Sequence, residues 1–171
     1  KYNFFDDEKL ESYMKNYSDE AYNAFSIIIP PAMKADLWRY IILYENGGIY
    51  ADCDIKLIEN LDNVINKDDK LVVVYDNSKK CDNIFQAFIA CTKYHPALKE
   101  AMDTTIHNIT NKVYDSKLPS ARNTFNISGP SMFGKIVKKY ECRHLYHDIR
   151  NETIIDSNKN ILMKTQCDCK N

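Results

Sequence analysis

The chain has 171 residues, of which 44% are hydrophobic and 27% are charged, and its formal net charge at pH 7 is −1. This length and balance predict a single globular domain over residues 1–171. The near-neutral charge argues against nucleic acid as a partner, and the longest apolar runs, at 27–31 and 71–75, are too short to span a bilayer. The chain does not begin with Met, which leaves open a fragment or a processed form, shortened at either end.

Residues 1–29 predict two helices. An acidic stretch at 6–8 suits the first turn of a helix at 9–17, because carboxylates stabilise the positive end of the helix dipole. Ser18 is a typical N-cap for the second helix, since its hydroxyl accepts a backbone hydrogen bond. Pro30 and Pro31 then interrupt the chain, and the main helix begins at Pro31 or Ala32.

The main helix carries an apolar stripe with a charged pair beside it. Helical spacing places five side chains on the stripe: Met33, Leu37, Tyr40, Ile41 and Tyr44. Asp36 and Arg39 are three residues apart, so they are neighbours on a flank of this stripe. Gly47 and Gly48 predict the end of the helix, because glycine adopts the left-handed conformation that closes a last turn.

A short strand with an acidic end follows at 49–55. Residues alternate between the two faces of a strand, so Tyr50, Asp52 and Asp54 are expected on one face and the apolar residues, Cys53 among them, on the other. Two carboxylates on one face repel each other unless a cation joins them. The two carboxylates therefore indicate a functional role for this stretch, such as binding a cation, rather than a role in packing.

The remaining elements predict a domain of the α/β class. Residues 56–65 suggest a strand end and a short helix, and the β-branched run at 71–75 suggests a strand buried on both faces. Residues 84–91 fit either a strand or a helix, with a slight preference for helix. The later segments are expected as a helix at 96–111, an irregular stretch at 113–122, a turn at 126–130, a helix at 131–140 and strands in the tail, with a turn at 156–160.

The six cysteines show no zinc-ligand spacing, and none forms a CxxC pair. Reduced structural thiols are the simplest interpretation. The pair Cys167 and Cys169, near the end of the chain, has no assigned role.

An Asp-x-Asp sequence at the end of a strand suits a divalent cation. Carboxylate oxygens are hard ligands that favour Mg²⁺ or Mn²⁺, and these ions commonly bridge to the phosphates of a substrate. Asp52 and Asp54 suffice as protein ligands when a diphosphate supplies others. The three-residue pattern alone is common, so its value depends on its surroundings.

Those surroundings resemble a known family. The block ADLWRYIILYENGGIYADCD at 35–54 is similar to the sugar-binding region of DXD-containing glycosyltransferases of the family-32 type, which includes yeast α-1,6-mannosyltransferase-like enzymes. It is similar also to the catalytic core of the clostridial glucosylating toxins. Weaker and shorter resemblances lie elsewhere, at 4–7, 82–87, 95–96 and 128–130.

The resemblance implies a GT-A fold, here without its first strands, and a hexose transferred from a UDP- or GDP-sugar to a glycan or protein acceptor with retention of configuration. It implies that Asp52 and Asp54 hold Mn²⁺ or Mg²⁺ and the donor. By the same resemblance Asp36 would accept hydrogen bonds from sugar hydroxyls, Arg39 would bind the sugar or the diphosphate, and Tyr50 would lie against the nucleotide.

The resemblance also suggests lesser donor contacts at Gly47, Gly48, Asn83 and Gly129. Viral or bacterial relatives favour a cytoplasmic location over the Golgi lumen. Two alternatives stay open. A metal-dependent phosphohydrolase or nucleotidyltransferase would need a third carboxylate, for which Asp76 and Asp82 are the candidates, and a non-catalytic carbohydrate-binding module would need no metal.

Overall fold

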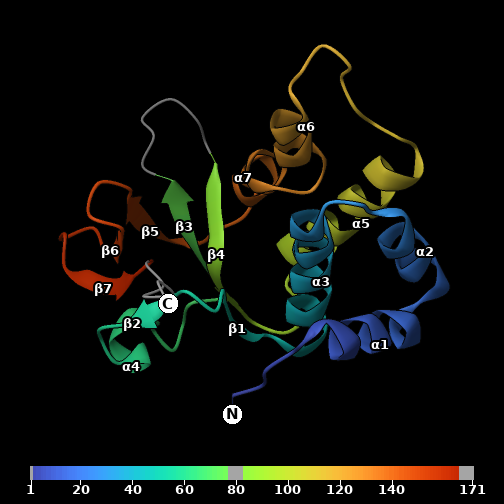
Figure 1. Cartoon of the computed structure of the whole chain (residues 1–171). Coiled ribbons are helices and arrows are strands. Elements are labelled where there is room, and N and C mark those ends of the chain that lie inside the picture. Colours follow the sequence, from blue (N-terminus) through green and yellow to red (C-terminus); the bar gives the residue numbers. More distant parts are fainter. Residues whose placement is uncertain (1, 77–82, 166–171) are drawn as a thin grey trace, which may run out of the picture.

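The computed structural model describes residues 2–76 and 83–165 as an α/β fold with a sheet on one side and most of the helices on the other (Figure 1). The helices are α1 (Asp7–Tyr17), α2 (Asp19–Ile27), α3 (Pro31–Asn46), α4 (Leu61–Val64), α5 (Pro96–Thr110), α6 (Ser120–Ile127) and α7 (Pro130–Val137). The strands are β1 (Gly48–Ala51), β2 (Lys56–Leu57), β3 (Leu71–Asp76), β4 (Ile84–Cys91), β5 (Arg143–Asp148), β6 (Thr153–Ile155) and β7 (Ile161–Lys164).

Within the described residues the strands form one sheet in the order β1-β4-β3-β5-β6-β7-β2. All neighbours are antiparallel except β3 and β5, which run parallel. β1 lies at an edge, and its register pairs Ala51 with Phe88 of β4. The loop that follows β1 therefore runs alongside the middle of β4, which is where the candidate site is built.

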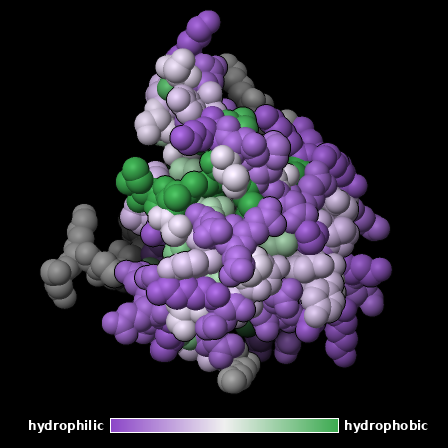
Figure 2. Space-filling view, turned by 90° about the vertical axis from the view of Figure 1, so that its right-hand side faces the viewer, coloured by the Kyte–Doolittle hydropathy of each residue, from purple (hydrophilic) through white to green (hydrophobic). Residues whose placement is uncertain are grey.

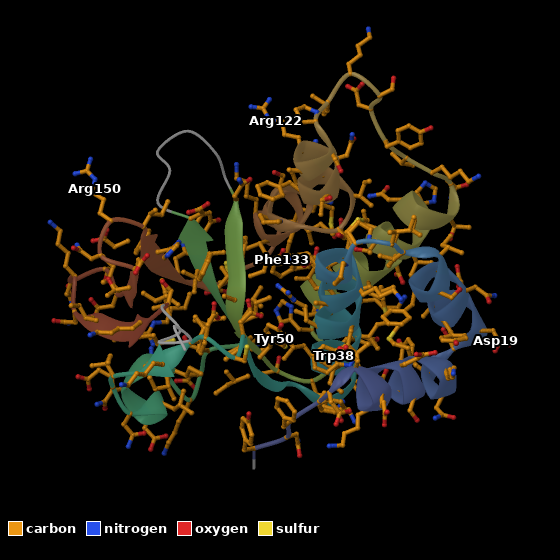
Figure 3. All side chains as sticks on the ribbon, viewed as in Figure 1. Asp19, Trp38, Tyr50, Arg122, Phe133 and Arg150 are labelled. Carbon is orange, nitrogen blue, oxygen red and sulfur yellow. The ribbon has the colours of Figure 1, made fainter. Side chains whose placement is uncertain are left out.

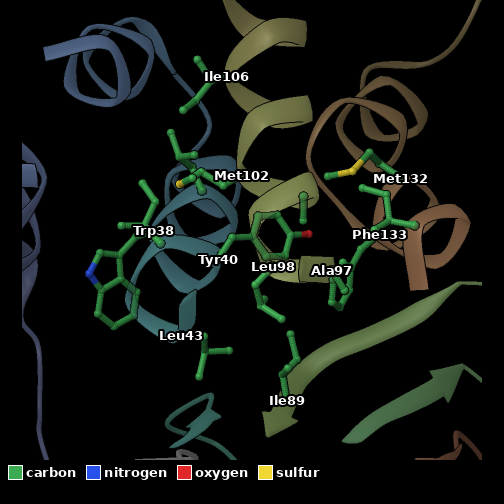
Figure 4. Packing of buried hydrophobic residues seen from close by; sticks show 14 of the residues in the cluster. Trp38, Tyr40, Leu43, Ile89, Ala97, Leu98, Met102, Ile106, Met132 and Phe133 are labelled. Carbon is green, nitrogen blue, oxygen red and sulfur yellow. The ribbon is translucent and has the colours of Figure 1, made fainter. Parts of the chain in front are cut away.

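The main hydrophobic core lies between the sheet and helices α3, α5 and α7. Tyr40 of α3 is completely buried, and it crosses toward Phe133 of α7 at a ring-centroid distance of 5.1 Å (Figure 4). A smaller cluster on the other side contains Val64 of α4 with side chains of β3 to β7, such as Leu145. Half of the residues of α3 are buried, and the helix contacts α5, β1 and β4.

The outer surface of the helical layer is mostly hydrophilic (Figure 2). That view looks at the right-hand side of Figure 1, where α2 lies, and hydrophobic side chains gather in only a small part of it. None of the helices in 2–76 and 83–165 is both long and apolar enough to cross a membrane.

Several predicted elements are confirmed. Ser18 caps α2 by accepting a hydrogen bond from the Ala21 backbone at 3.1 Å, and α3 begins at Pro31. The turn at 156–160 is present, since the Asp156 backbone donates to the Asn160 carbonyl. The buried strand expected at 71–75 is β3.

The slight preference for helix at 84–91 was wrong. This segment is β4, which pairs with β1 on one side and β3 on the other. Seven of its eight residues are buried, so the apolar side chains do not alternate. Periodicity cannot separate a fully buried strand from a buried helix, and the pairing with two neighbours decides.

Two further boundaries differ from expectation. The irregular stretch and the turn expected across 113–130 contain α6, which leaves only Ser128 and Gly129 between α6 and α7. α6 has no buried residue, so the sequence offers no strong apolar stripe by which to find it. Cys53 is exposed, although a buried apolar face was expected there.

The expected reduced state fits the cysteines that the structure describes. Cys53, Cys91 and Cys142 are free. Cys81, Cys167 and Cys169 lie outside the described residues.

Gly47 closes α3 in a conformation that only glycine adopts readily, with φ +65° and ψ −165°. A Cβ atom at this position would lie 2.6 Å from the Lys93 backbone nitrogen, whereas one at Gly48, where φ is +97°, would meet nothing within 4 Å. Both positions strain an L-residue, but only Gly47 also lacks space.

We expect Gly47→Ala to lower the free energy of unfolding by about 3 kcal/mol or more, because a backbone clash adds to dihedral strain of about 1–3 kcal/mol. Gly48→Ala, the matched control, should cost only the strain. Urea unfolding of both variants measures the difference. Equal losses would show that the contact with Lys93 does not constrain the end of α3.

Candidate functional site

A buried ion pair in the middle of α3 is the centre of the candidate site. Asp36 and Arg39 lie one helical turn apart, and an Asp36 carboxylate oxygen is 3.6 Å from the Arg39 guanidinium. Their side chains are only 7% and 8% exposed. The expected proximity of the two residues is confirmed, and their burial shows that the pair is not a solvated surface salt bridge.

Arg39 joins α3 to the strands that face it. Its Nη1 donates to the Gln86 carbonyl of β4 at 3.0 Å, and its Nη2 lies 4.0 Å from the Asp52 carboxylate. The guanidinium carbon is 4.7 Å from the ring centre of Tyr50, which lies where the sheet meets α3 (Figure 3). Its buried Nε has no hydrogen-bond partner within the described residues. The described residues thus leave this buried donor unsatisfied.

Asp52 and Asp54 lie on a turn rather than on a strand, so the expected strand at 49–55 was too long. β1 ends at Ala51, after which the Asp52 backbone donates to the Ala87 carbonyl at 2.9 Å and Ile55 donates back to the Asp52 carbonyl at 3.1 Å. The sheet edge turns away at this point, so strand alternation does not extend to Asp54. Tyr50 and Asp52 still meet, because the Tyr50 hydroxyl donates to an Asp52 oxygen at 2.5 Å.

The turn provides oxygen atoms that suit a hard cation. The Asp54 Oδ1 atom is buried and has no hydrogen-bond partner among the described residues, and such an acceptor is costly unless a ligand or ion satisfies it. Asp52 is only half-buried, which leaves it accessible. No cluster of three or more metal-ligating side chains occurs in 2–76 and 83–165. A cation here would thus need ligands from a substrate or from water.

The lesser candidate residues fall in three places. Gly129 is near the ion pair, since a Cβ there would lie 3.6 Å from an Asp36 oxygen and 3.1 Å from the Phe125 Cα atom. Asn83 directly precedes β4 and accepts a hydrogen bond from Ser131 of α7 at 2.9 Å. Gly47 and Gly48 are at the opposite end of β1 from the Asp-x-Asp turn, where they shape the exit from α3.

Three uncharged residues form hydrogen bonds around the ion pair, and the sequence did not predict this bonding for any of them. The Ser128 hydroxyl donates to Asp36 Oδ2 at 2.8 Å, and the Ser128 carbonyl accepts from the Tyr40 hydroxyl at 2.7 Å. The Gln86 side chain donates to that same hydroxyl. Only the weak family resemblance at 128–130 signalled Ser128. Nothing local in the sequence signals Tyr40 or Gln86 as polar partners.

Burial shifts the ionisation of the site. It raises the pKa of Asp36 to about 6, although the Arg39 charge and the Ser128 hydrogen bond act in the opposite direction. Burial also raises the pKa of the Tyr50 hydroxyl, so that it stays protonated at neutral pH and donates a hydrogen bond to Asp52. The pKa of Arg39 is raised too, because the fields of Tyr50, Asp36 and Asp52 outweigh its desolvation.

Asp36 should impose a pH dependence on stability. Its pKa is raised from 3.8 to about 6 on folding, so the folded state binds the proton more tightly. The contribution of this group to stability is therefore fully present below about pH 4 and is lost as pH rises through about 6. The Asp36→Asn variant should lack this decline. Its stability relative to the wild type should increase between pH 4.5 and pH 7 by roughly 2 kcal/mol, measured by urea unfolding.

Asp68→Asn serves as the control, because Asp68 is exposed and remote in sequence from the ion pair. It should keep the wild-type slope. Parallel curves for wild type and Asp36→Asn would contradict the raised pKa.

Comparisons with known proteins agree with the sequence resemblance. Residues 2–72 match the model of the family described as "Glycosyltransferase sugar-binding region containing DXD motif". The chain is 27% identical over 162 residues to an uncharacterized glycosyltransferase of Acanthamoeba polyphaga mimivirus, covering 90% of this chain and 57% of that protein. The chain thus spans little more than half of this viral relative.

The fold has a counterpart among solved structures. The PaToxG glycosyltransferase superimposes with a TM-score of 0.53 at 18% sequence identity, over 75% of this chain and 42% of that one. This confirms the expected α/β fold of GT-A type. By sequence and by fold, the chain is similar to glycosyltransferases, and residues 2–72 match the model of their DXD-containing sugar-binding region.

Proposed function

We propose that this chain is the donor-binding part of a metal-dependent glycosyltransferase. It would transfer a hexose from a UDP- or GDP-sugar to a glycan or protein acceptor, with retention of anomeric configuration. The viral relative is the ground for proposing that this happens in the cytoplasm.

One observation carries the proposal. A buried carboxylate–guanidinium pair, Asp36 and Arg39, reaches the Asp-x-Asp turn through Asp52 at 4.0 Å. The same small region offers an unpaired Arg39 Nε donor and an unpaired Asp54 oxygen. Donors and acceptors left unsatisfied in a buried place suit a ligand that carries both anionic and hydroxyl groups, as a nucleotide sugar does.

Each protein group has a task in such a transfer. When the bond between the sugar and the diphosphate breaks, negative charge grows on the leaving phosphate, and the Arg39 guanidinium is held in place to stabilise it. Its planar fork suits paired oxygen atoms better than an ammonium group would. Asp36 accepts hydrogen bonds from sugar hydroxyls and favours positive charge on the reacting carbon.

Mn²⁺ or Mg²⁺ would be held by Asp52 and Asp54, and it would supply a Lewis acid beside the diphosphate. Tyr50 prepares Asp52 for this role, because its hydroxyl bond and its stacking on Arg39 limit the orientations of the carboxylate. The unpaired Asp54 oxygen is the observation that favours a cation.

A phosphohydrolase or nucleotidyltransferase is the rival enzyme class. It would require a third carboxylate near the metal, and Asp76 instead lies 3.6 Å from His147, at the end of β3. The other candidate, Asp82, lies outside the described residues. The buried position of Arg39 and Asp36 beside the turn favours sugar transfer.

A non-catalytic carbohydrate-binding module is the second rival, and calorimetry separates it. Such a module would bind an acceptor glycan equally well with and without metal. The proposed transferase would instead bind its donor in a metal-dependent way.

A thermal-shift screen of UDP- and GDP-sugars with Mn²⁺ should identify the donor. A ligand at 100 times its dissociation constant stabilises the folded state by about 2.7 kcal/mol, which raises the melting temperature of a domain of this size by roughly 5–10 °C. The screen repeated without Mn²⁺ is the control. Equal shifts with and without the metal would contradict metal-dependent donor binding.

The double variant Asp52→Asn with Asp54→Asn should lose donor hydrolysis in Mn²⁺ by about 100-fold or more, because both proposed metal ligands become neutral. Hydrolysis is followed by release of nucleoside diphosphate. Asp68→Asn, which changes an exposed aspartate, should retain wild-type activity. Unchanged hydrolysis in the double variant would exclude the proposed role of the motif.

A further inference from the structure

A closed ring of polar contacts surrounds the ion pair inside the core. Asp36 accepts from the Ser128 hydroxyl at 2.8 Å, and the Ser128 carbonyl accepts from the Tyr40 hydroxyl at 2.7 Å. Gln86 donates its side-chain amide to that hydroxyl, and its carbonyl accepts from Arg39 at 3.0 Å. Arg39 then returns to Asp36 at 3.6 Å.

The ring is buried throughout. Ser128 and Tyr40 are fully buried, and Gln86 is 5% exposed. A hydrophobic core does not need such a ring, since well-packed apolar side chains in place of buried polar groups are often as stabilising or more so. Its presence therefore calls for a reason other than stability.

Ser128 occupies a special position in the ring. It lies in the two-residue joint between α6 and α7, 92 positions from Asp36 in the chain. Its hydroxyl donates to the Asp36 carboxylate, and its backbone carbonyl accepts from the Tyr40 hydroxyl. Ser128 therefore joins two residues of α3 to the joint between α6 and α7. The following Gly129 leaves space beside the same carboxylate oxygen.

We propose that Ser128 is a positioning residue of the donor site, which holds the Asp36 carboxylate in the orientation that receives the sugar. The inference rests on the proposed function. Arg39 fixes one oxygen of Asp36 and Ser128 fixes the other, and together they determine the plane of the carboxylate. Tyr40 and Gln86 hold Ser128 and Arg39 in turn, and they act on the donor only through these two residues.

This arrangement makes a selective prediction. Asp36 is the proposed sugar contact, whereas the diphosphate is assigned to Arg39 and the metal. Removal of the Ser128 hydroxyl should therefore weaken binding of the sugar moiety and leave binding of the nucleoside diphosphate nearly unchanged. A residue that matters only for packing would affect both ligands alike or neither.

The test compares two ligand pairs by calorimetry in Mn²⁺: UDP-glucose with UDP, and GDP-mannose with GDP. For the pair that the wild type binds, Ser128→Ala should weaken nucleotide-sugar binding about tenfold, the usual effect of losing one hydrogen bond to a charged group. Binding of the matching diphosphate should change less than about twofold. Ser128→Thr, which keeps the hydroxyl, should bind the nucleotide sugar with nearly the wild-type affinity.

A buried hydroxyl outside the ring provides the matched control. Thr105 of α5 is fully buried, and its hydroxyl has no partner within the described residues. Thr105→Val should leave both affinities unchanged. If Ser128→Ala does not fold, Tyr40→Phe breaks the neighbouring contact of the ring, and it should show the same selective loss to a smaller extent.

The outcomes separate the two proposals. Equal weakening for the nucleotide sugar and the diphosphate, or no weakening of either, overturns the role of Ser128 while the wild type still binds its donor. A wild type that binds no UDP- or GDP-sugar in the thermal-shift screen overturns the proposed function, and this inference with it.

Discussion

The burial of Arg39 is the constraint on which the rest of the site depends. A guanidinium that is only 8% exposed must find partners for its charge and its donors inside the protein. Asp36 supplies the charge from the same helix, and the β4 backbone accepts one donor through the Gln86 carbonyl. These contacts fix the distance and rotation of α3 relative to the sheet. The position of the Asp-x-Asp turn is then set by β1, which pairs with β4.

Local rules recovered the parts of the site that local geometry controls. The pairing of Asp36 with Arg39 follows from helical spacing, and the end of α3 at Gly47 follows from the conformational freedom of glycine. The start of α3 follows from the two prolines. All three depend on residues within a few positions of one another, so no knowledge of the tertiary structure was needed.

The errors occurred where distant neighbours decide the outcome. The strand at 49–55 was predicted too long because the pairing of β1 with β4 ends at Ala51. No residue within 49–55 indicates where this pairing ends. The segment at 84–91 became a strand because two other strands flank it. Ser128 and Gln86 were missed as partners of the ion pair for the same reason: their bonds span 92 and 47 positions of the chain.

The ring of buried contacts has a consequence for what counts as the functional unit. The family model ends at residue 72 and includes both the ion pair and the Asp-x-Asp turn. Gln86 and Ser128, which complete the surroundings of that pair, come from later in the chain. The segment that matches the family model is thus shorter than the set of residues that surrounds the ion pair. A graft of residues 2–72 onto another scaffold would carry the charges of the site without the partners that orient them.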